Sequence, residues 1–250
     1  MKQQEYKYVK MTLHPLGVQG LTQRSPWAAA WWSVALPGLG HFYLGSFAKG
    51  FILISWEIVI NTMANLNLAI YYTLIGDVPQ AAQVLELKWV VLYPGIYMLA
   101  IWDSYRVAVE ENRLYDLERL QAKRFFEYHT TAFFGQNMLL KRNPWVPVFW
   151  SAVLGGAGHF HNMQLIKGAM LMGWYLVIVI KSSLSQAVVY TLLGQYDLAQ
   201  QVVDYQWILF WPSIHLFNIW NAYVDCVEQN KLYDEAQYYW LKEQEKPTST

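Results

Sequence analysis

Two ionisable residues interrupt long apolar stretches of the sequence and are the first candidates for chemistry. Glu57 lies among isoleucine, leucine and valine residues, and Lys181 directly follows a run of the same residue types. Ionisable side chains in such stretches usually face the interior of a helix bundle and pair. We therefore predict a structural pair of Glu57 and Lys181 within a polar patch that includes Asn61 and Ser182. The alternatives are a lysine that extends to the polar edge and a proton- or substrate-linked site.

Two histidines occupy equivalent positions in a motif that occurs twice. His41 and His159 lie 118 residues apart, each next to a pair of glycines. Paired imidazoles can exchange a proton or bind a metal ion. Neither histidine has a partnering cysteine or carboxylate at metal-ligand spacing, so we predict a hydrogen-bonded role in a turn, no metal site and no cofactor.

Charged residues recur at helical spacing after the third apolar stretch of the sequence. Asp103, Arg106, Glu110 and Arg113 predict contacts from Asp103 to Arg106 and from Arg106 to Glu110 on one helix face. We interpret them as the point where a helix leaves the apolar environment. A catalytic carboxylate pair is the alternative, but no nucleophile, metal cluster or phosphate-binding loop accompanies it, so the sequence favours the absence of enzymatic activity.

The composition indicates which solvent surrounds the elements that must position these residues. Hydrophobic residues make up 55% of the chain, charged residues 14% and aromatic residues 17%. Too few polar groups remain to cover a water-soluble surface, and tryptophan and tyrosine are typical of membrane interfaces. The net charge of zero disfavours nucleic-acid binding. The single cysteine, Cys226, is interpreted as a small buried apolar residue.

The elements come in two copies. A shift of 118 residues aligns residues 26–116 with 144–234 without a gap, with 36 identities in 91 positions. Chance gives only a handful, so we infer a duplicated membrane module. The predicted organisation is a cytoplasmic N-terminal segment at 1–25, the two repeats, a basic linker at 117–143 and a polar tail at 235–250.

The two terminal regions and the linker carry their own expectations. We predict that the linker is an ordinary connector between helices, with a segment resting on the membrane surface as the alternative. The polar end of the chain is expected to be disordered.

Each repeat contains a glycine-rich turn followed by a Lys-Gly pair. Glycine permits backbone angles that are forbidden to other residues and lets helices approach closely. The predicted turn residues are Gly38, Gly40, His41, Lys49 and Gly50 in the first repeat and Gly156, Gly158, His159, Lys167 and Gly168 in the second.

Each repeat also contains three apolar segments, which in the first repeat cover residues 27–45, 49–75 and 89–109. The first is interrupted by proline and glycine, whereas the other two are long enough to cross a bilayer. The basic N-terminal segment, linker and Lys49 turn predict one cytoplasmic side, and the loop at 77–88 should face outward. Parallel repeats with four spans and two re-entrant hairpins fit these charges better than the alternative of inverted repeats with six spans.

Residues 36–45, which read Leu-Pro-Gly-Leu-Gly-His-Phe-Tyr-Leu-Gly, and the Lys-Gly pair that follows resemble the turn of the small two-helix transmembrane-domain family and related bacterial membrane proteins. The helix end Trp-Asp-Ser-Tyr, with Asp103 and Tyr105, and the later Asn112 resemble the end of that module. The second copy keeps Tyr223 but has Asn221 in place of the aspartate, which suggests a degenerated site. The resemblance implies a membrane location and helical hairpins, and implies no reaction.

The sequence thus predicts an all-α integral membrane protein of the bacterial plasma membrane, built from a duplicated helical-hairpin module with about four to six membrane segments. The predicted function is a non-enzymatic scaffold or accessory subunit of a membrane complex. Its partners would be the lipid bilayer and another membrane protein, or a second copy of itself, contacted through aromatic and glycine-rich faces. A small transporter or channel-like component with a polar site between the repeats is the alternative, and an intramembrane enzyme is a third possibility.

Overall fold

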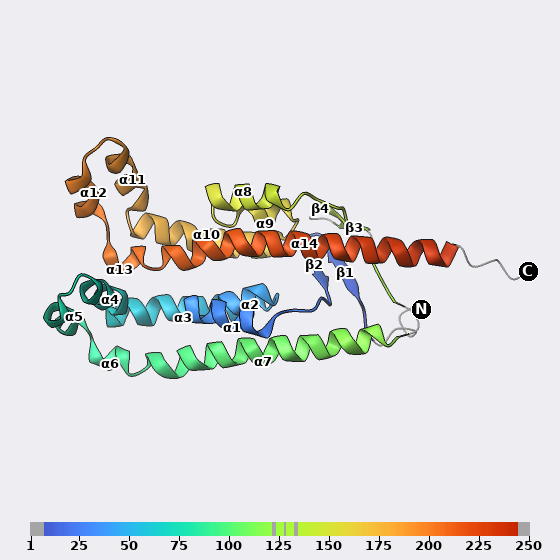
Figure 1. The fold of residues 1–250 in the computed structure, drawn as a ribbon, viewed down its shortest axis with the longest axis horizontal. Coiled ribbons are helices and arrows are strands. Elements are labelled where there is room, and N and C mark those ends of the chain that lie inside the picture. Colours follow the sequence, from blue (N-terminus) through green and yellow to red (C-terminus); the bar gives the residue numbers. More distant parts are fainter. Residues whose placement is uncertain (1–7, 122–123, 128, 133–134, 245–250) are drawn as a thin grey trace, which may run out of the picture.

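The computed structural model describes residues 8–121, 124–127, 129–132 and 135–244. The chain is mostly helical, as predicted, but it also contains two antiparallel β-hairpins that were not predicted (Figure 1). The first half comprises β1 (Met11–His14), β2 (Gly17–Gly20), α1 (Pro26–Ala35), α2 (Leu39–Tyr43), α3 (Phe47–Ala64), α4 (Leu66–Leu74), α5 (Val78–Val84), α6 (Leu87–Val90) and α7 (Tyr93–Arg119).

The second half repeats this order of elements. It comprises β3 (His129–Ala132), β4 (Gly135–Met138), α8 (Trp145–Val153), α9 (Ala157–His161), α10 (Leu165–Lys181), α11 (Leu184–Leu192), α12 (Tyr196–Val202), α13 (Tyr205–Ile208) and α14 (Trp211–Gln244). The hairpins obey the same 118-residue offset as the helices, because β1 begins at Met11 and β3 begins at His129. The duplicated unit therefore starts before the first apolar segment and includes a hairpin.

The hairpins change the interpretation of the N-terminal segment and the linker. The expectation of an ordinary connector at 117–143 is wrong, because β3 and β4 lie within it. In β1, Met11 and Leu13 alternate with more exposed residues and pack in a small core with Leu232 and Ala236 of α14. Two alternating apolar residues are too short a pattern to predict a strand from sequence, and the packing against α14 stabilises it.

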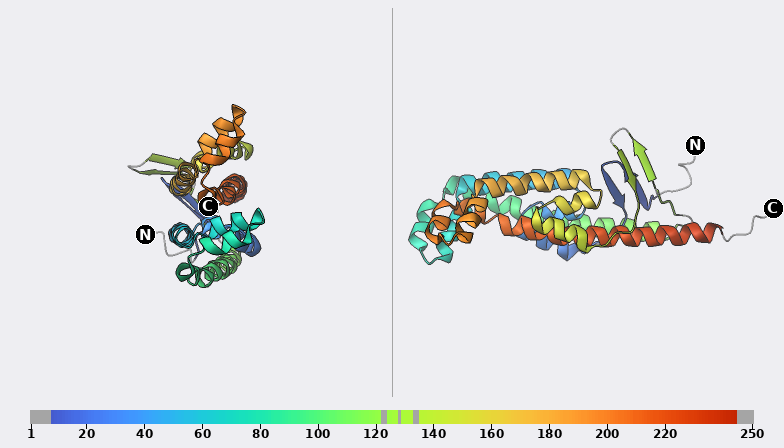
Figure 2. Two further views of the ribbon diagram at one scale, coloured as in Figure 1. Left: turned by 90° about the vertical axis from the view of Figure 1, so that its left-hand side faces the viewer. Right: turned by 90° about the horizontal axis from the view of Figure 1, so that it is seen from above.

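The two repeats run in the same direction. In both views, α3 and α10 lead from the hairpin end to the far end, and α7 and α14 return (Figures 1 and 2). The short helices α4–α6 and α11–α13 gather together at the far end. There the backbone N–H of Leu68 donates to Oε1 of Gln206 at 2.8 Å, joining the repeats. The structure thus has the parallel arrangement that the charge pattern favoured.

The second apolar segment of each repeat is broken, whereas one continuous segment was expected. Asn65 and Ser183 adopt left-handed backbone angles, with φ of 54° and 55°, and separate α3 from α4 and α10 from α11. The freed carbonyl of Ala64 accepts a hydrogen bond from the backbone N–H of Glu86 at 3.2 Å. The segment that follows in the first repeat, expected as a loop, contains the short helices α5 and α6, and Glu86 lies between them.

Among the described residues, fewer helices than expected are long and apolar enough to cross a bilayer. Only α3 is by itself long and apolar enough to cross a bilayer. The number rises to three if two helix pairs, one bent by 80° before α7 and one by 59° between α10 and α11, are each a single span. The helix α14 has many charged residues in its second half, which extends beyond the bundle (Figure 1).

The glycine-rich turns connect α1 to α2 and α8 to α9 as tight hairpins. Gly38 has φ of 102°, in the region that favours glycine. A Cβ atom on Gly40 would lie 2.1 Å from the carbonyl oxygen of Ala29, and one on Gly158 would lie 2.0 Å from that of Pro147. These glycines are buried against their own chain. Gly40 and Gly158 are therefore not available to a partner, whereas the expectation of a partner itself stays a prediction.

The C-terminal region is more ordered than expected. The helix α14 continues to Gln244, so most of the tail predicted at 235–250 is helical. Residues 245–250 lie outside the described residues. Cys226 is fully buried in α14, as predicted.

Candidate functional site

The first charged cluster joins the turn of the first repeat to α7. Oδ2 of Asp103 lies 3.0 Å from Nε2 of His41 and 2.9 Å from Nζ of Lys49. Its Oδ1 accepts from Arg106 at 2.6 Å, and Arg106 also donates to Glu110 at 2.7 Å. The contacts predicted from helical spacing are confirmed. The cluster ties the hairpin of α1 and α2 to the long helix.

The second repeat has the same cluster with a different aspartate. Nζ of Lys167 donates to Oδ2 of Asp225 at 2.7 Å, and Nδ1 of His159 lies 3.4 Å from the same oxygen. Asn221, which aligns with Asp103, makes no side-chain hydrogen bond within the described part of the chain. The interpretation that this site is degenerate is wrong. Asp225 lies four residues after Asn221, so it projects from the same helix face one turn later.

The two clusters differ most in their exposure to solvent. The side chain of Lys49 is 55% exposed, whereas those of Lys167 and Asp225 are 2% and 1% exposed. A buried ion pair depends on both partners, because removal of one leaves an uncompensated charge in a weakly polarisable environment. The cluster of the second repeat is therefore a structural centre, and the cluster of the first repeat is open to water.

A third polar group surrounds Glu57, but without the predicted lysine. The carboxylate of Glu57 accepts hydrogen bonds from Nδ2 of Asn61 at 3.0 Å and from the hydroxyl of Tyr93 at 3.1 Å. Lys181 is exposed, and no ion pair joins it to Glu57 in the described residues. The predicted pair is wrong: Lys181 is the last residue of α10 and its side chain is exposed. Ser182 is buried and donates to the carbonyl of Val179 at 3.3 Å.

Gln206, from the second repeat, joins the hydrogen-bond network around Glu57. Its Nε2 donates to Oδ1 of Asn61 at 2.8 Å, and its backbone carbonyl accepts from Nδ2 of Asn67 at 3.0 Å. A cavity of about 220 Å³ lies beside this network and is lined by Glu57, Asn61 and Tyr93. Sequence reasoning missed Gln206, because it aligns with Lys88, at the end of the loop expected at 77–88.

The helix-end residues of the family-like motif have aromatic partners in both repeats. Tyr105 packs edge-on against Trp27 with ring centroids 5.3 Å apart. The aligned pair, Tyr223 and Trp145, has centroids 5.7 Å apart. These rings fasten the start of α1 to α7 and the start of α8 to α14.

Two arginine–asparagine pairs, which sequence reasoning missed as a repeated unit, hold the chain as it enters each repeat. Asn112 accepts from the backbone N–H of Arg24 and donates to its carbonyl, both at 2.8 Å. Asn230 does the same to Arg142, at 2.8 and 2.7 Å. The signal was present, because both pairs obey the 118-residue offset. These bonds hold the backbone of Arg24 and Arg142 after each β-hairpin.

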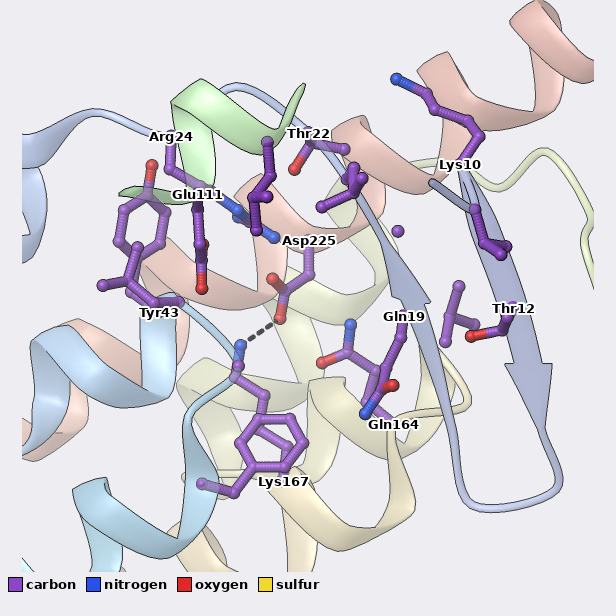
Figure 3. A pocket seen from close by; sticks show the side chains of 18 residues that line it. Lys10, Thr12, Gln19, Thr22, Arg24, Tyr43, Glu111, Gln164, Lys167 and Asp225 are labelled. Atoms are coloured by element: carbon purple, nitrogen blue, oxygen red, sulfur yellow. Dashed lines mark hydrogen bonds and ion pairs between the residues drawn. The ribbon is translucent and has the colours of Figure 1, made fainter. Parts of the chain in front are cut away.

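Arg24 lies at the edge of a polar cavity between the repeats (Figure 3). The cavity has a volume of about 370 Å³. It is bounded by the β1–β2 hairpin, the start of α3, the C-terminal half of α7 and the N-terminus of α10. Its charged lining residues are Lys10, Arg24, Glu111, Lys167 and Asp225. The carbonyl of Leu16 in the hairpin turn accepts from the backbone N–H of Leu165 at 3.0 Å and holds the hairpin over the cavity.

Burial raises the pKa of two acids beside this cavity. Glu111 lies beyond the apolar part of α7, and burial raises its pKa to about 7, against the opposing effect of Arg24 and assisted by Glu228. Burial also raises the pKa of Glu228, although Arg24 lies 2.7 Å away and lowers it. A carboxyl group with a pKa near neutrality can gain or lose its charge under physiological conditions.

No group of three or more histidine, cysteine, aspartate or glutamate residues that could hold a metal ion occurs in the described part of the chain. The observed contacts of the two histidine–lysine–aspartate clusters are ion pairs and hydrogen bonds. Comparisons with known protein families, with curated proteins and with solved structures find no match for this chain.

Proposed function

We propose that this chain is a non-enzymatic, multi-pass protein of a bacterial plasma membrane that acts as a scaffold or accessory subunit of a membrane complex. The observation that carries the proposal is that the distribution of polar and apolar residues is the reverse of that in a water-soluble protein. Many large apolar side chains are exposed on the surface of the helix bundle, and many polar side chains are buried between the helices. The outward residues include Trp31, Ile52, Met98, Trp102, Phe149 and Ile180. The buried polar ones include Glu57, Asn61, Asn67, Lys167, Asp225 and Gln229.

The proposed topology has four spans, formed by α3, α7, α10 and α14. The helix α3 has 18 residues, which is about 27 Å at the helical rise and close to the hydrocarbon thickness of a bilayer. The equivalence of the repeats extends the same assignment to α10. The hairpins α1–α2 and α8–α9 are then re-entrant, and the β-hairpins and both long helix ends lie on the cytoplasmic side. The resemblance to the small two-helix transmembrane-domain family supports this assignment.

The partner surface in this proposal is aromatic. The glycines of the turns are occupied by internal packing, and Trp27, Trp31 and Trp102 remain 74%, 66% and 59% exposed on α1 and α7. Tryptophan rings suit both the membrane interface and contacts between proteins. The proposed partner is another integral membrane protein.

Site-specific photocrosslinking in native membranes tests the scaffold proposal. A photoreactive residue at Trp102 should give one protein adduct of constant mass, because that face of α7 meets the partner. The same residue at Arg113, which is exposed on the charged part of α7, is the control and should give none. Adducts with lipid alone at Trp102 contradict the scaffold role, and a chain that stays monodisperse in buffer without detergent contradicts the membrane assignment.

A small transporter or channel-like component is the second candidate, and the cavity beside Glu57 favours it. The same cavity also fits a purely structural network, because Glu57, Asn61, Asn67 and Gln206 hydrogen-bond one another into a connected group. Proteoliposomes separate the two: the scaffold proposal expects no ion or solute flux. A flux that is lost in a folded Glu57→Gln variant would favour the transporter instead.

A further inference from the structure

The cavity between the first hairpin and α10 has the dimensions of a small-ligand site. Its volume of about 370 Å³ lies at the lower end of the range for such sites. Figure 3 shows side chains from both repeats converging on it, with Glu111 from α7 on one side and Gln164 and Lys167 from the start of α10 on the other. A ligand here would contact both halves of the molecule.

The cations that line the cavity already have partners. Nζ of Lys10 lies 3.4 Å from Glu235 and 3.7 Å from Glu118. The guanidinium of Arg24 lies 2.7 Å from Glu228. An anionic ligand would have to compete with these carboxylates, and with Asp225 for Lys167. The cavity is therefore poorly suited to bind an anion.

The acid Glu111 has no such partner. It makes no hydrogen bond or ion pair within the described residues, and only the more distant charges of Arg24 and Glu228 act on it. Oε1 of Gln164, which also lines the cavity, is buried and without a hydrogen-bond donor. Glu111 itself is partly exposed. A buried acceptor without a donor is costly, so a ligand that brings N–H donors to Gln164 would be favoured.

In the second repeat, the residue equivalent to Glu111 has hydrogen-bond partners, so the lack of a partner at Glu111 is specific to the first repeat. Gln229 aligns with Glu111, accepts from the guanidinium of Arg142 at 3.1 Å and donates to the carbonyl of Asn162 at 3.1 Å. In the first repeat, Arg24 turns to Glu228 of the other half instead. The same scaffold thus satisfies a neutral amide in one copy and leaves a carboxylate free in the other.

We propose that this cavity binds the primary ammonium group of a small ligand, with the Glu111 carboxylate as its counter-charge and the Gln164 amide oxygen as a second acceptor in the lining. An ammonium group supplies three N–H donors and one positive charge, which matches the two free acceptors. The ring of Phe47 also lines the cavity and offers a face that attracts cations. The ligand is either a free amine or the ethanolamine headgroup of a lipid, since Leu21, Leu44 and Leu114 provide an apolar wall for a chain.

The binding should depend on pH. Burial raises the pKa of Glu111 to about 7, so the carboxylate is largely neutral at pH 6 and largely charged at pH 8. The other charged groups that face it are Arg24, Glu228, Lys167, Asp225 and Lys10, together with the hydroxyl of Tyr43. Because the Glu111 carboxylate gains its negative charge between pH 6 and pH 8, the affinity for an amine should rise over this range.

Binding measurements on the detergent-purified full chain test the proposal. Ethanolamine should raise the melting temperature at pH 8, and choline, which has no N–H donors, should raise it far less. The variant Glu111→Gln should lose at least tenfold in ethanolamine affinity while keeping the same helix content, because Gln229 shows that the fold accepts an amide there. Glu110→Gln, at the neighbouring exposed acid, is the matched control and should bind as the parent chain does.

Nanodiscs distinguish the two sources of the ammonium group. Stabilisation by phosphatidylethanolamine over phosphatidylcholine, without an effect of free ethanolamine, assigns the site to a lipid headgroup. Stabilisation by free ethanolamine assigns it to a soluble amine. Three outcomes overturn the proposal: equal stabilisation of the parent chain and Glu111→Gln, stabilisation by choline equal to that by ethanolamine, or no response to either free ethanolamine or phosphatidylethanolamine.

Discussion

At the scale of single residues, the charged clusters show how a duplicated site is rebuilt. Asp103 serves the first repeat, and Asp225 serves the second from one helical turn further along α14. The replacement works because the positions share a helix face, so Lys167 and His159 still reach a carboxylate. The second cluster is more deeply buried, and this difference decides how much each lysine matters to stability.

Substitution of the two equivalent lysines should have unequal effects. Lys167→Met leaves Asp225 buried without its cation and should lower the free energy of unfolding by about 3–5 kcal/mol. Lys49→Met should cost about 0–1 kcal/mol, because Lys49 is exposed and Asp103 keeps Arg106 and His41. Unfolding in mixed micelles measures both. Equal losses in the two variants would refute the structural role assigned to the second cluster.

At the scale of elements, the close packing of α1 against α2 depends on glycine, which has no side chain at the point of contact. Gly40 brings α2 against the carbonyl of Ala29, and Gly158 repeats the contact against Pro147. The neighbouring Ser151 hydroxyl accepts from the backbone N–H of Gly158 at 3.2 Å. The hairpins of the two repeats are thus built by the same backbone packing, although the residues around them differ.

Adding one methyl group at these crossings should destabilise the protein. Gly40→Ala places a Cβ atom 2.1 Å from backbone, which cannot move aside easily, so the melting temperature should fall with a loss of about 1–3 kcal/mol. Gly173→Ala is the control, since nothing lies within 4 Å of its Cβ position in α10 and alanine favours helices. An unchanged melting temperature in Gly40→Ala would show that the hairpin is not closely packed.

At the scale of the whole molecule, the parallel repeats give the protein two different ends. One end carries the short helices α4–α6 and α11–α13, and the other carries both hairpins and the extension of α14 (Figures 1 and 2). At the hairpin end, Lys10 and Arg124 bridge Glu118 of α7 and Glu235 of α14. The charged ends of the two long helices are therefore fastened together outside the apolar region.

Cysteine labelling of membrane vesicles checks the parallel arrangement. Leu74→Cys and Leu192→Cys, at equivalent exposed positions, should react with an impermeant maleimide from the same side of the membrane. Leu120→Cys, at the end of α7, should react from the opposite side. The parent chain is the control, because its Cys226 is buried. Labelling of Leu74→Cys and Leu192→Cys from opposite sides would instead indicate inverted repeats.

The sequence alone determined the features that depend on spacing along the chain. The 118-residue repeat, the mainly helical class and the contacts of Arg106 with Asp103 and Glu110 follow from periodicity, because residues three or four apart on a helix are neighbours in any fold. The glycine-rich turns were recognisable for the same reason, since backbone freedom is a property of the residue itself.

The tertiary structure decided everything that joins distant segments. It placed Gln206 beside Asn61, turned Lys181 outward and directed Arg24 to Glu228 of the other repeat, which leaves Glu111 free in a cavity. None of these contacts has a signature in the spacing of its residues. They depend on the rotation and offset of two parallel bundles, which the summed packing of many side chains determines.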